Sequence, residues 1–98
     1  MNPLLHPEAD AEFIAAARHY TEISPELGGR FYDEVSALLH EASAHPRCYR
    51  LYDPPIRRLL AHGFPYAVLY AVQADCIRIV AVMHLKRRPG YWKHRLHD

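Results

Sequence analysis

The chain has 98 residues, of which 50% are hydrophobic and 23% are charged. This length and composition predict one folded domain over residues 1–98 and exclude a chain that is disordered throughout. No apolar run is long enough to span a bilayer and no signal-peptide pattern is present, so we expect a cytoplasmic protein that does not interact with membranes.

Charge is divided unevenly along the sequence. Residues 1–45 carry two arginines and eight carboxylates, a net of −6, whereas residues 46–98 carry ten lysines and arginines and three carboxylates, a net of +7. This asymmetry predicts one surface that binds an anion, either nucleic acid or an acidic protein segment.

The first half of the chain predicts a short strand followed by two helices. Residues 4–6 are an apolar run that can pair as an edge strand. Pro7 suits the first turn of a helix that ends near Ile23. Ser24 can cap a second helix, which stops before Pro46. The short break between the helices predicts an antiparallel helical hairpin.

Each helix carries an apolar stripe, with polar residues elsewhere on its surface. In the second helix, the pair Gly28-Gly29 costs about 1 kcal/mol of helix stability per glycine. The pair either lets the two helices approach closely or marks a frayed first turn. The residues of the first helix that mostly fall outside its stripe are Glu12, Arg18, His19 and Glu22.

The second half of the chain predicts antiparallel strands. Residues 46–55 form a loop with a possible strand at Cys48–Leu51, and the proline pair at the end of the loop excludes a central strand there. Residues 56–60 form the next strand. Residues 66–72 and 77–84 are two apolar runs that form a β-hairpin.

A tight turn in this hairpin sets which residues face each other. Tyr70 then lies opposite Ile79 and Val68 opposite Ala81, and the larger apolar side chains share a face that we assign to the core. The other face is a shallow groove, which is covered either by the chain's own C-terminal tail or by a partner. It carries Ala67, Leu69, Ala71, Arg78, Val80, Val82 and His84.

The order of these elements predicts an α+β domain. An N-terminal strand and a two-helix antiparallel hairpin pack on one face of a small antiparallel sheet. After the last strand, basic residues crowd around Tyr91 and Trp92 in a short tail, in which Pro89 can start a short helix.

The sequence contains no nucleophile–base motif, no phosphate-binding glycine loop and no carboxylate pair. Cys48 and Cys76 match no ligand spacing and are typical of reduced thiols. The eight histidines are scattered without accompanying ligands. We therefore expect neither a metal nor a cofactor.

The remaining candidates for a functional site are basic and aromatic. Guanidinium groups bind phosphate, aromatic rings stack on bases, and His or Tyr can transfer a proton at a ribose hydroxyl. These groups suffice for RNA cleavage without a metal, although a basic tail is more often a solvated or partner-binding surface. The candidates are Arg57, Arg58, Arg78, His84, Lys86, Arg87, Arg88, Tyr91, Trp92 and Arg95.

Many short motifs follow one another in a characteristic order along nearly the whole chain. They are Phe31-Tyr32-Asp33-Glu34-Val35, Pro46, Arg57-Arg58-Leu59, Phe64-Pro65-Tyr66, Val68, Tyr70, Ile77, Ile79, Ala81, Val82, His84, Arg87, Pro89, Tyr91, Trp92 and Arg95. In this order and spacing, the sequence resembles the RelE/ParE family of bacterial type II toxins.

The resemblance implies the toxin of a toxin–antitoxin pair of the plasmid-stabilisation type, which arrests bacterial growth. It also implies a hetero-oligomer with a cognate antitoxin that is acidic and partly disordered when free. RelE-like members cut messenger RNA on the ribosome, and ParE-like members inhibit DNA gyrase. The lack of a clear catalytic set favours the ParE-like activity; a RelE-like nuclease and an inactive relative that only binds its antitoxin are the alternatives.

The resemblance further implies roles for individual residues. If the protein is a nuclease, Arg78 and His84 act from one strand face, and the catalytic candidates are Arg58, Arg78, His84 and Tyr91. The candidates for binding the antitoxin or the target are Arg57, Lys86, Arg87, Arg88, Trp92, Lys93 and Arg95.

Overall fold

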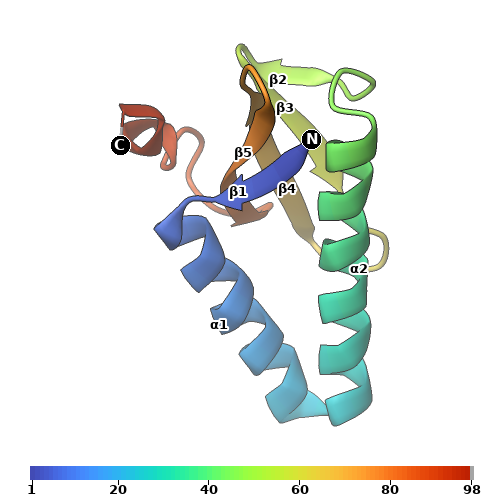
Figure 1. Ribbon diagram of the computed structural model, residues 1–98. Helices are drawn as coiled ribbons and strands as arrows, with labels where there is room; N and C mark the ends of the chain where they lie inside the picture. The colour runs from blue at the N-terminus through green and yellow to red at the C-terminus, as the bar shows by residue number, and fades with distance from the viewer. Residues whose placement is uncertain (98) are drawn as a thin grey trace.

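The computed structural model describes residues 1–97 and consists of a helical hairpin packed on one face of a five-stranded sheet (Figure 1). The elements in chain order are β1 (Asn2–Leu5), α1 (Pro7–Ile23), α2 (Pro25–Ala44), β2 (Leu51–Asp53), β3 (Ile56–Leu60), β4 (Tyr66–Val72), β5 (Cys76–His84) and the 3-10 helix η1 (Lys93–His97). This is the α+β domain predicted from the sequence.

Both helices begin where the sequence predicts. Pro7 is the first residue of α1, and the His6 side chain accepts a hydrogen bond from the Glu8 amide. At the start of α2, the Ser24 hydroxyl accepts a hydrogen bond from the Leu27 amide at 3.0 Å. These caps satisfy amide groups that have no partner within the helix.

The two helices approach each other closely at Gly28. A Cβ atom placed on Gly28 would overlap the Thr21 side chain and lie 2.8 Å from the Thr21 Cα atom. A Cβ atom on Gly29 would meet open space. Close approach of the helices is therefore the correct interpretation of Gly28, and it offsets the cost of a glycine inside a helix.

The strands lie in the order β1-β5-β4-β3-β2. Strands β2 to β5 pair antiparallel as predicted, but β1 pairs with β5 in parallel, so the prediction of an antiparallel sheet is wrong for this strand. A helical hairpin and three strands separate β1 from β5 along the chain, so no tight turn constrains their relative direction.

Two predicted boundaries differ from the structure. The strand expected at Cys48–Leu51 is instead Leu51–Asp53, directly before Pro54, where it forms an edge of the sheet. Proline is compatible with that position because an edge strand leaves amide groups unpaired. The terminal helix begins at Lys93 rather than at Pro89.

A β-bulge in β5 interrupts the alternation of its side chains. Tyr70 pairs with Ile79 as predicted, but the preceding Leu69 pairs with Ala81, so Val80 is an extra residue in β5. A bulge of this kind moves every later side chain of the strand to the opposite face. The predicted faces of β5 are therefore correct before Val80 and wrong after it.

The bulge changes which residues of β5 enter the core beneath the helices. Val68 pairs with Val82 rather than with Ala81, and Val82 belongs to the hydrophobic cluster that includes helix residues. Ala81 and Met83 belong to a second cluster on the opposite face.

The same shift separates two predicted site residues. His84 pairs with Tyr66, and both line a cavity beneath α1. Arg78 lies between Ile77 and Ile79, which face the helices, so its side chain is on the opposite face. The prediction that Arg78 and His84 share a face is therefore wrong.

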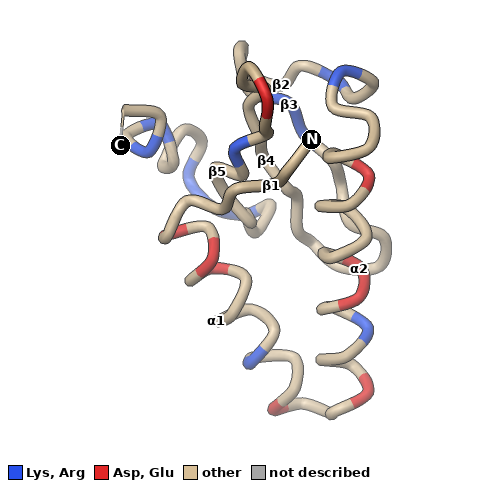
Figure 2. The backbone as a smooth tube through the Cα atoms, in the orientation of Figure 1, with Lys and Arg blue, Asp and Glu red and all other residues tan. Residues whose placement is uncertain are grey.

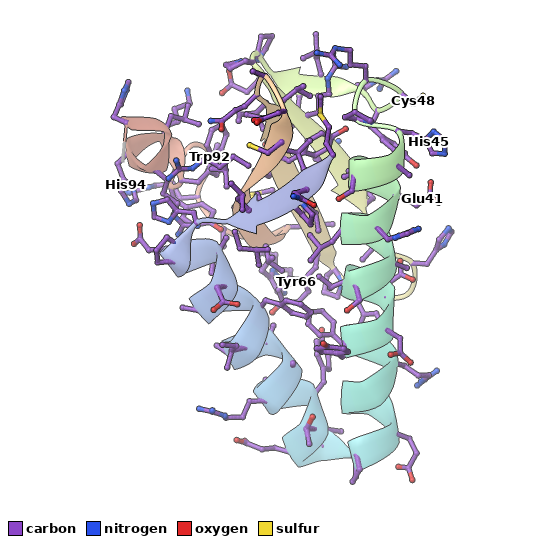
Figure 3. The ribbon with its side chains drawn as sticks, viewed as in Figure 1. Glu41, His45, Cys48, Tyr66, Trp92 and His94 are labelled. Carbon is purple, nitrogen blue, oxygen red and sulfur yellow. The ribbon has the colours of Figure 1, made fainter. Side chains whose placement is uncertain are left out.

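One hydrophobic cluster covers each face of the sheet. On the helix face, Phe31 and Val35 of α2 pack with residues such as Tyr70. On the other face, which we call the tail face, Trp92 packs on Leu69 and is 1% exposed. Figure 3 shows Trp92 between the end of the C-terminal tail and the sheet, and Tyr66 between the sheet and the helices. Of the two covers that the sequence left open for the groove, the chain's own tail is the correct one.

Acidic and basic residues lie in different layers of the molecule (Figure 2). All eight carboxylates of residues 1–45 belong to α1 or α2. The arginines and lysines of residues 46–97 belong to the sheet, its loops and the tail. The charge asymmetry of the sequence thus becomes an acidic helix layer and a basic sheet layer.

Candidate functional site

The edge of β5 is open where β1 ends. β1 pairs with β5 as far as Leu5 opposite Ile79, and the His6 amide donates to the Ile79 carbonyl. Among residues 1–97, no strand continues this pairing along the remainder of β5. Backbone groups on such an edge need other hydrogen-bond partners.

Glu12 of α1 and Arg95 of η1 provide these partners. Glu12 Oε1 accepts a hydrogen bond from the Val82 amide at 3.1 Å, and Arg95 Nη1 donates to the Val80 carbonyl at 3.0 Å. Arg95 also donates two hydrogen bonds to the Glu12 carboxylate, at 2.8 and 3.1 Å. The Tyr91 hydroxyl donates to Glu12 Oε2 at 2.6 Å. We call Glu12, Val82, Tyr91 and Arg95 the Glu12 cluster.

The Glu12 cluster contains a largely buried ion pair. The side chains of Arg95 and Glu12 are 5% and 15% exposed. Burial alone would lower the pKa of Arg95, but the hydrogen bonds and charge of Glu12 outweigh it and hold the pKa above its ordinary value. Burial, together with the hydrogen bond to Glu12, raises the pKa of Tyr91. Both groups therefore remain hydrogen-bond donors at neutral pH.

A more exposed contact joins the same two segments one helical turn earlier. Glu8 Oε2 lies 2.9 Å from His94 Nε2 and 3.4 Å from Arg95 Nε. The hydrogen bond from His94 lowers the pKa of Glu8. The start of α1 is therefore attached to the tail at two carboxylates one helical turn apart, Glu8 and Glu12.

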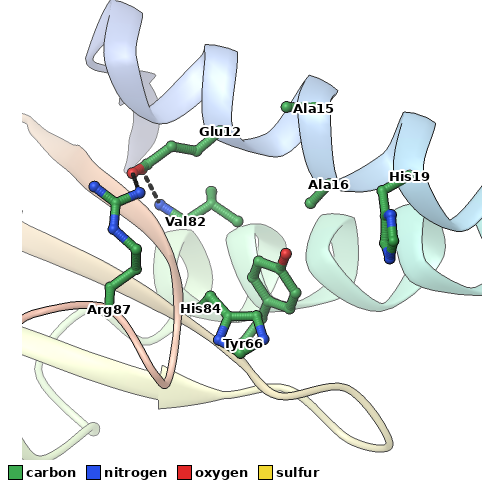
Figure 4. Close-up of a pocket in the computed structure, with 8 residues that line it drawn as sticks. All are labelled: Glu12, Ala15, Ala16, His19, Tyr66, Val82, His84 and Arg87. Atoms are coloured by element: carbon green, nitrogen blue, oxygen red, sulfur yellow. Dashed lines mark hydrogen bonds and ion pairs between the residues drawn. The ribbon is translucent and has the colours of Figure 1, made fainter.

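A cavity of about 230 Å³ lies beside the Glu12 cluster (Figure 4). Helix α1 forms one wall, and the ends of β4 and β5 with the following turn form the other. In Figure 4 the Tyr66 hydroxyl points toward α1, with Arg87 on one side of it and His19 on the other. The lining residues are Glu12, Ala15, Ala16, His19, Tyr66, Val82, His84 and Arg87.

Local contacts orient the polar groups of the cavity. His84 Nδ1 accepts a hydrogen bond from the Lys86 amide at 3.0 Å, so a neutral His84 carries its proton on Nε2. The Tyr66 ring packs edge-on against His84, with 5.0 Å between ring centroids, and burial raises the pKa of Tyr66. The Arg87 guanidinium lies 3.9 Å from the centre of the Tyr91 ring.

The structure does not bring the four predicted catalytic residues together. Arg58 lies on the tail face, with its guanidinium 4.5 Å from the Tyr52 ring centre. Arg78 lies on the same face but beside β1, in a separate pocket. His84 lines the cavity on the helix face, and Tyr91 is bound to Glu12. Only His84 and Tyr91 share a neighbour, Glu12, which lines the cavity with His84 and accepts the hydrogen bond from Tyr91.

The predicted binding residues divide into exposed and buried groups. Lys86, Arg87 and Arg88 are exposed on the turn after β5. Trp92 is 1% exposed and Arg95 is 4% exposed, because both side chains fix the tail to the sheet. In this structure both side chains therefore make their contacts within the chain.

The other two predicted binding residues make contacts within the chain. Arg57 is half-buried and donates to the Tyr49 carbonyl at 2.8 Å. The Lys93 ammonium lies 3.2 Å from an Asp53 carboxylate oxygen, and both groups are exposed. Among the predicted binding residues, Lys86 and Arg88 make no side-chain hydrogen bond, ion pair or ring contact within residues 1–97, whereas Arg87 contacts Tyr91 and Glu12.

Glu12 is the central residue that sequence reasoning missed. Helical spacing placed it outside the apolar stripe of α1, and its partners Tyr91 and Arg95 lie more than 75 residues later. The only local signal is its position beside Phe13 and one turn before Ala16, two core residues. A carboxylate at the border of a buried stripe can turn inward when a buried arginine is available.

Two further features concern residues 1–97 as a whole. No group of three or more His, Cys, Asp and Glu side chains in this range is arranged to hold a metal ion. Neither α1 nor α2 combines the length and the apolar character that a bilayer-spanning helix requires.

Comparisons with known proteins relate this architecture to one family. Residues 4–89 match the family model described as the ParE toxin of the type II toxin–antitoxin system parDE. A solved structure, described as a chromosomal ParDE TA system from P. aeruginosa, aligns with a TM-score of 0.73, covering 86% of this chain and 95% of that chain. The two sequences are 20% identical, so this likeness concerns the fold. No curated protein matches the sequence.

Proposed function

Because the chain belongs to the ParE family of toxins from type II toxin–antitoxin systems, we propose that it arrests bacterial growth by inhibiting DNA gyrase in the cytoplasm. One observation carries the choice of gyrase over messenger RNA. The arginines that a RelE-like nuclease would use, Arg58 and Arg78, lie on the opposite face of the sheet from His84. A phosphate bound beside His84 is therefore out of reach of both Arg58 and Arg78.

Pulse-labelling after controlled induction tests this proposal. Thymidine and methionine incorporation are followed in the same culture, and we expect thymidine incorporation to fall first. The purified protein should also inhibit supercoiling by purified gyrase. An early fall in methionine incorporation with unaffected supercoiling would contradict gyrase as the target. If neither incorporation changes, the chain is an inactive relative that only binds its antitoxin.

We also propose that a cognate antitoxin neutralises the protein through an acidic segment. The turn that carries Lys86, Arg87 and Arg88 supports this, because its three positive side chains are exposed. Reversing the charge of Arg87 and Arg88 should weaken antitoxin binding and reduce its dependence on salt. Titration calorimetry at two salt concentrations measures both effects, and unchanged binding would exclude this turn as the contact.

A ribosome-dependent nuclease is the second candidate, and one feature favours it. His84 and Arg87 line the same cavity, so a proton-transfer group and a phosphate-binding group are close together. If this activity is correct, induction should produce messenger RNA cleaved within codons, and His84→Gln should abolish the cleavage. Intact messenger RNA during growth arrest would exclude the nuclease.

A further inference from the structure

The cavity beneath α1 contains one carboxylate, and that carboxylate is already saturated. Glu12 accepts hydrogen bonds from the Val82 amide, the Tyr91 hydroxyl and two nitrogens of Arg95. An ionised carboxylate has about four acceptor positions. Glu12 therefore has no remaining capacity to accept hydrogen bonds from the other groups that line the cavity.

The other polar groups of the cavity are donors with free capacity. The Arg87 guanidinium comes no closer to Glu12 than 4.0 Å, and its side chain is 52% exposed. Within residues 1–97, the Tyr66 hydroxyl has no hydrogen-bond partner, and its raised pKa keeps it protonated. His84 uses Nδ1 as an acceptor, which leaves Nε2 to donate. A ligand for these groups must bring acceptor oxygens, and the Arg87 charge favours an anion.

The surroundings of the cavity distinguish between two kinds of anion. One wall belongs to α1, which also carries Glu8, Asp10 and Glu22, and both helices together carry a net charge of −6. This layer repels a nucleic acid, whose phosphates repeat along the whole strand. The apolar walls at Ala15, Ala16 and Val82 match the methylene groups of an amino-acid side chain. A single carboxylate on a short apolar stem fits both features.

We propose that this cavity binds a single side-chain carboxylate, that of a glutamate or aspartate of a partner peptide, with Arg87, His84 and Tyr66 as its donors. The identification of that peptide with the antitoxin rests on the proposed function. The binding of the carboxylate does not, because it follows from the groups that line the cavity.

The test uses the full chain and short probes of defined composition. Two blocked tripeptides, acetyl-Ala-Glu-Ala-amide and acetyl-Ala-Gln-Ala-amide, and inorganic phosphate are titrated into isotope-labelled protein. Side-chain NMR signals of His84, His19 and Arg87 report on the cavity. We expect saturable shifts with the glutamate peptide and none with the glutamine peptide. Equal shifts with both peptides, or none with either, would overturn the proposal.

Phosphate separates the two sources of anion. If phosphate binds more tightly than the glutamate peptide, the cavity serves a phosphate-bearing partner and the proposal is wrong. Competition between the two probes at the same signals, with the peptide binding more tightly, supports it.

Two neighbouring arginines provide matched variants. Arg87→Gln should weaken glutamate-peptide binding by about tenfold, because it removes a charge-assisted hydrogen bond. Arg88→Gln removes the same charge from the next residue, outside the cavity lining, and should change binding by less than about twofold. Equal losses in both variants would show long-range attraction without a site. If either variant is unfolded by circular dichroism, the two peptides on the unaltered protein decide the question.

Toxicity is measured separately, so the two proposals can fail independently. Growth arrest without peptide binding would overturn the cavity proposal and leave the proposed function intact. Peptide binding without growth arrest would overturn the proposed toxicity and leave the cavity proposal intact.

Discussion

The two faces of the sheet are covered in different ways. On the helix face, two long helices bury aromatic and aliphatic side chains such as Phe31 and Tyr70. On the tail face, the C-terminal tail contributes Trp92 and is attached through the Glu12 cluster at the edge of β5. Buried hydrophobic area is the main interaction that holds the helices on the sheet, whereas attachment of the tail also depends on a buried ion pair. The two covers should therefore respond differently to substitution.

Removing Glu12 should have the largest effect. Glu12→Ala leaves the buried guanidinium of Arg95 with only the half-exposed Glu8 carboxylate as a counter-charge, and the Val82 amide without its acceptor. We expect a loss of about 3–5 kcal/mol in the free energy of unfolding. Urea unfolding measures this. The matched control is Glu22→Ala, an exposed carboxylate of the same helix, for which we expect a change within about 0.5 kcal/mol. Similar results for both would mean that the ion pair does not hold the tail.

Tyr91→Phe tests the hydroxyl that completes the cluster. Loss of a hydrogen bond to a charged group should cost about 1.5–3 kcal/mol at neutral pH. The folded-state pKa of Tyr91 is raised, so the bond contributes fully below the unfolded pKa of 10.0 and is lost as the pH rises above it.

Unfolding measurements between neutral pH and strongly alkaline pH check this dependence. The stability difference between the unaltered protein and Tyr91→Phe should shrink as the pH rises above about 10. Tyr32→Phe is the control, because the exposed Tyr32 stacks on Phe13 and donates no hydrogen bond within residues 1–97. A pH-independent difference for Tyr91→Phe would contradict its role as a neutral donor.

The helix face is tested at the point where the helices are closest. Gly28→Ala should destabilise the protein by about 1–3 kcal/mol, because the new methyl group meets Thr21. Gly29→Ala, one residue later, meets open space and should stabilise the protein by about 0.5–1 kcal/mol through helix propensity. Thermal melts of the two variants should move in opposite directions. Melts that shift in the same direction would refute the close packing at Gly28.

The exposed end of the tail should matter least. Lys93→Ala removes the ion pair with Asp53, in which both side chains are substantially exposed. We expect a change of about 0–1 kcal/mol, which falls further at high salt. A larger loss in urea unfolding would mean that the tail is held along its whole length and not mainly at Trp92 and Arg95.

Much of the fold could be predicted because its signals are local. The helix start at Pro7, the cap at Ser24, the helix end before Pro46 and the central hairpin all depend on residues close together in the chain. The β-bulge at Val80 could not be predicted from alternation, because both possible faces of β5 are apolar after that residue. The predicted face of His84, which follows the bulge, was therefore wrong, whereas the predicted face of Arg78, which precedes it, was correct.

The candidate site was harder to predict than the fold because it is assembled from distant segments. His84 and Arg87 were identified by residue type, but the cavity exists only because α1 and the end of β5 are packed together. Glu12 and Arg95 were assigned to surfaces because a charged side chain is usually exposed. Their burial depends on one another, and a pattern read along a single helix or tail does not contain that information.

The pairing of β1 with β5 has a consequence for synthesis of the protein. It joins residues 2–5 to residues 76–79. In the same way, the ion pair of Glu12 requires Arg95, which lies 83 residues later in the chain. A nascent chain grows from its N-terminus at ~5–20 residues per second, so its first strand emerges long before its partner exists. The pairing of β1 with β5 and the Glu12 cluster can form only after residues 76–79 and Arg95 have left the ribosome. A growing chain that has not yet exposed these residues therefore lacks the cavity beside the Glu12 cluster.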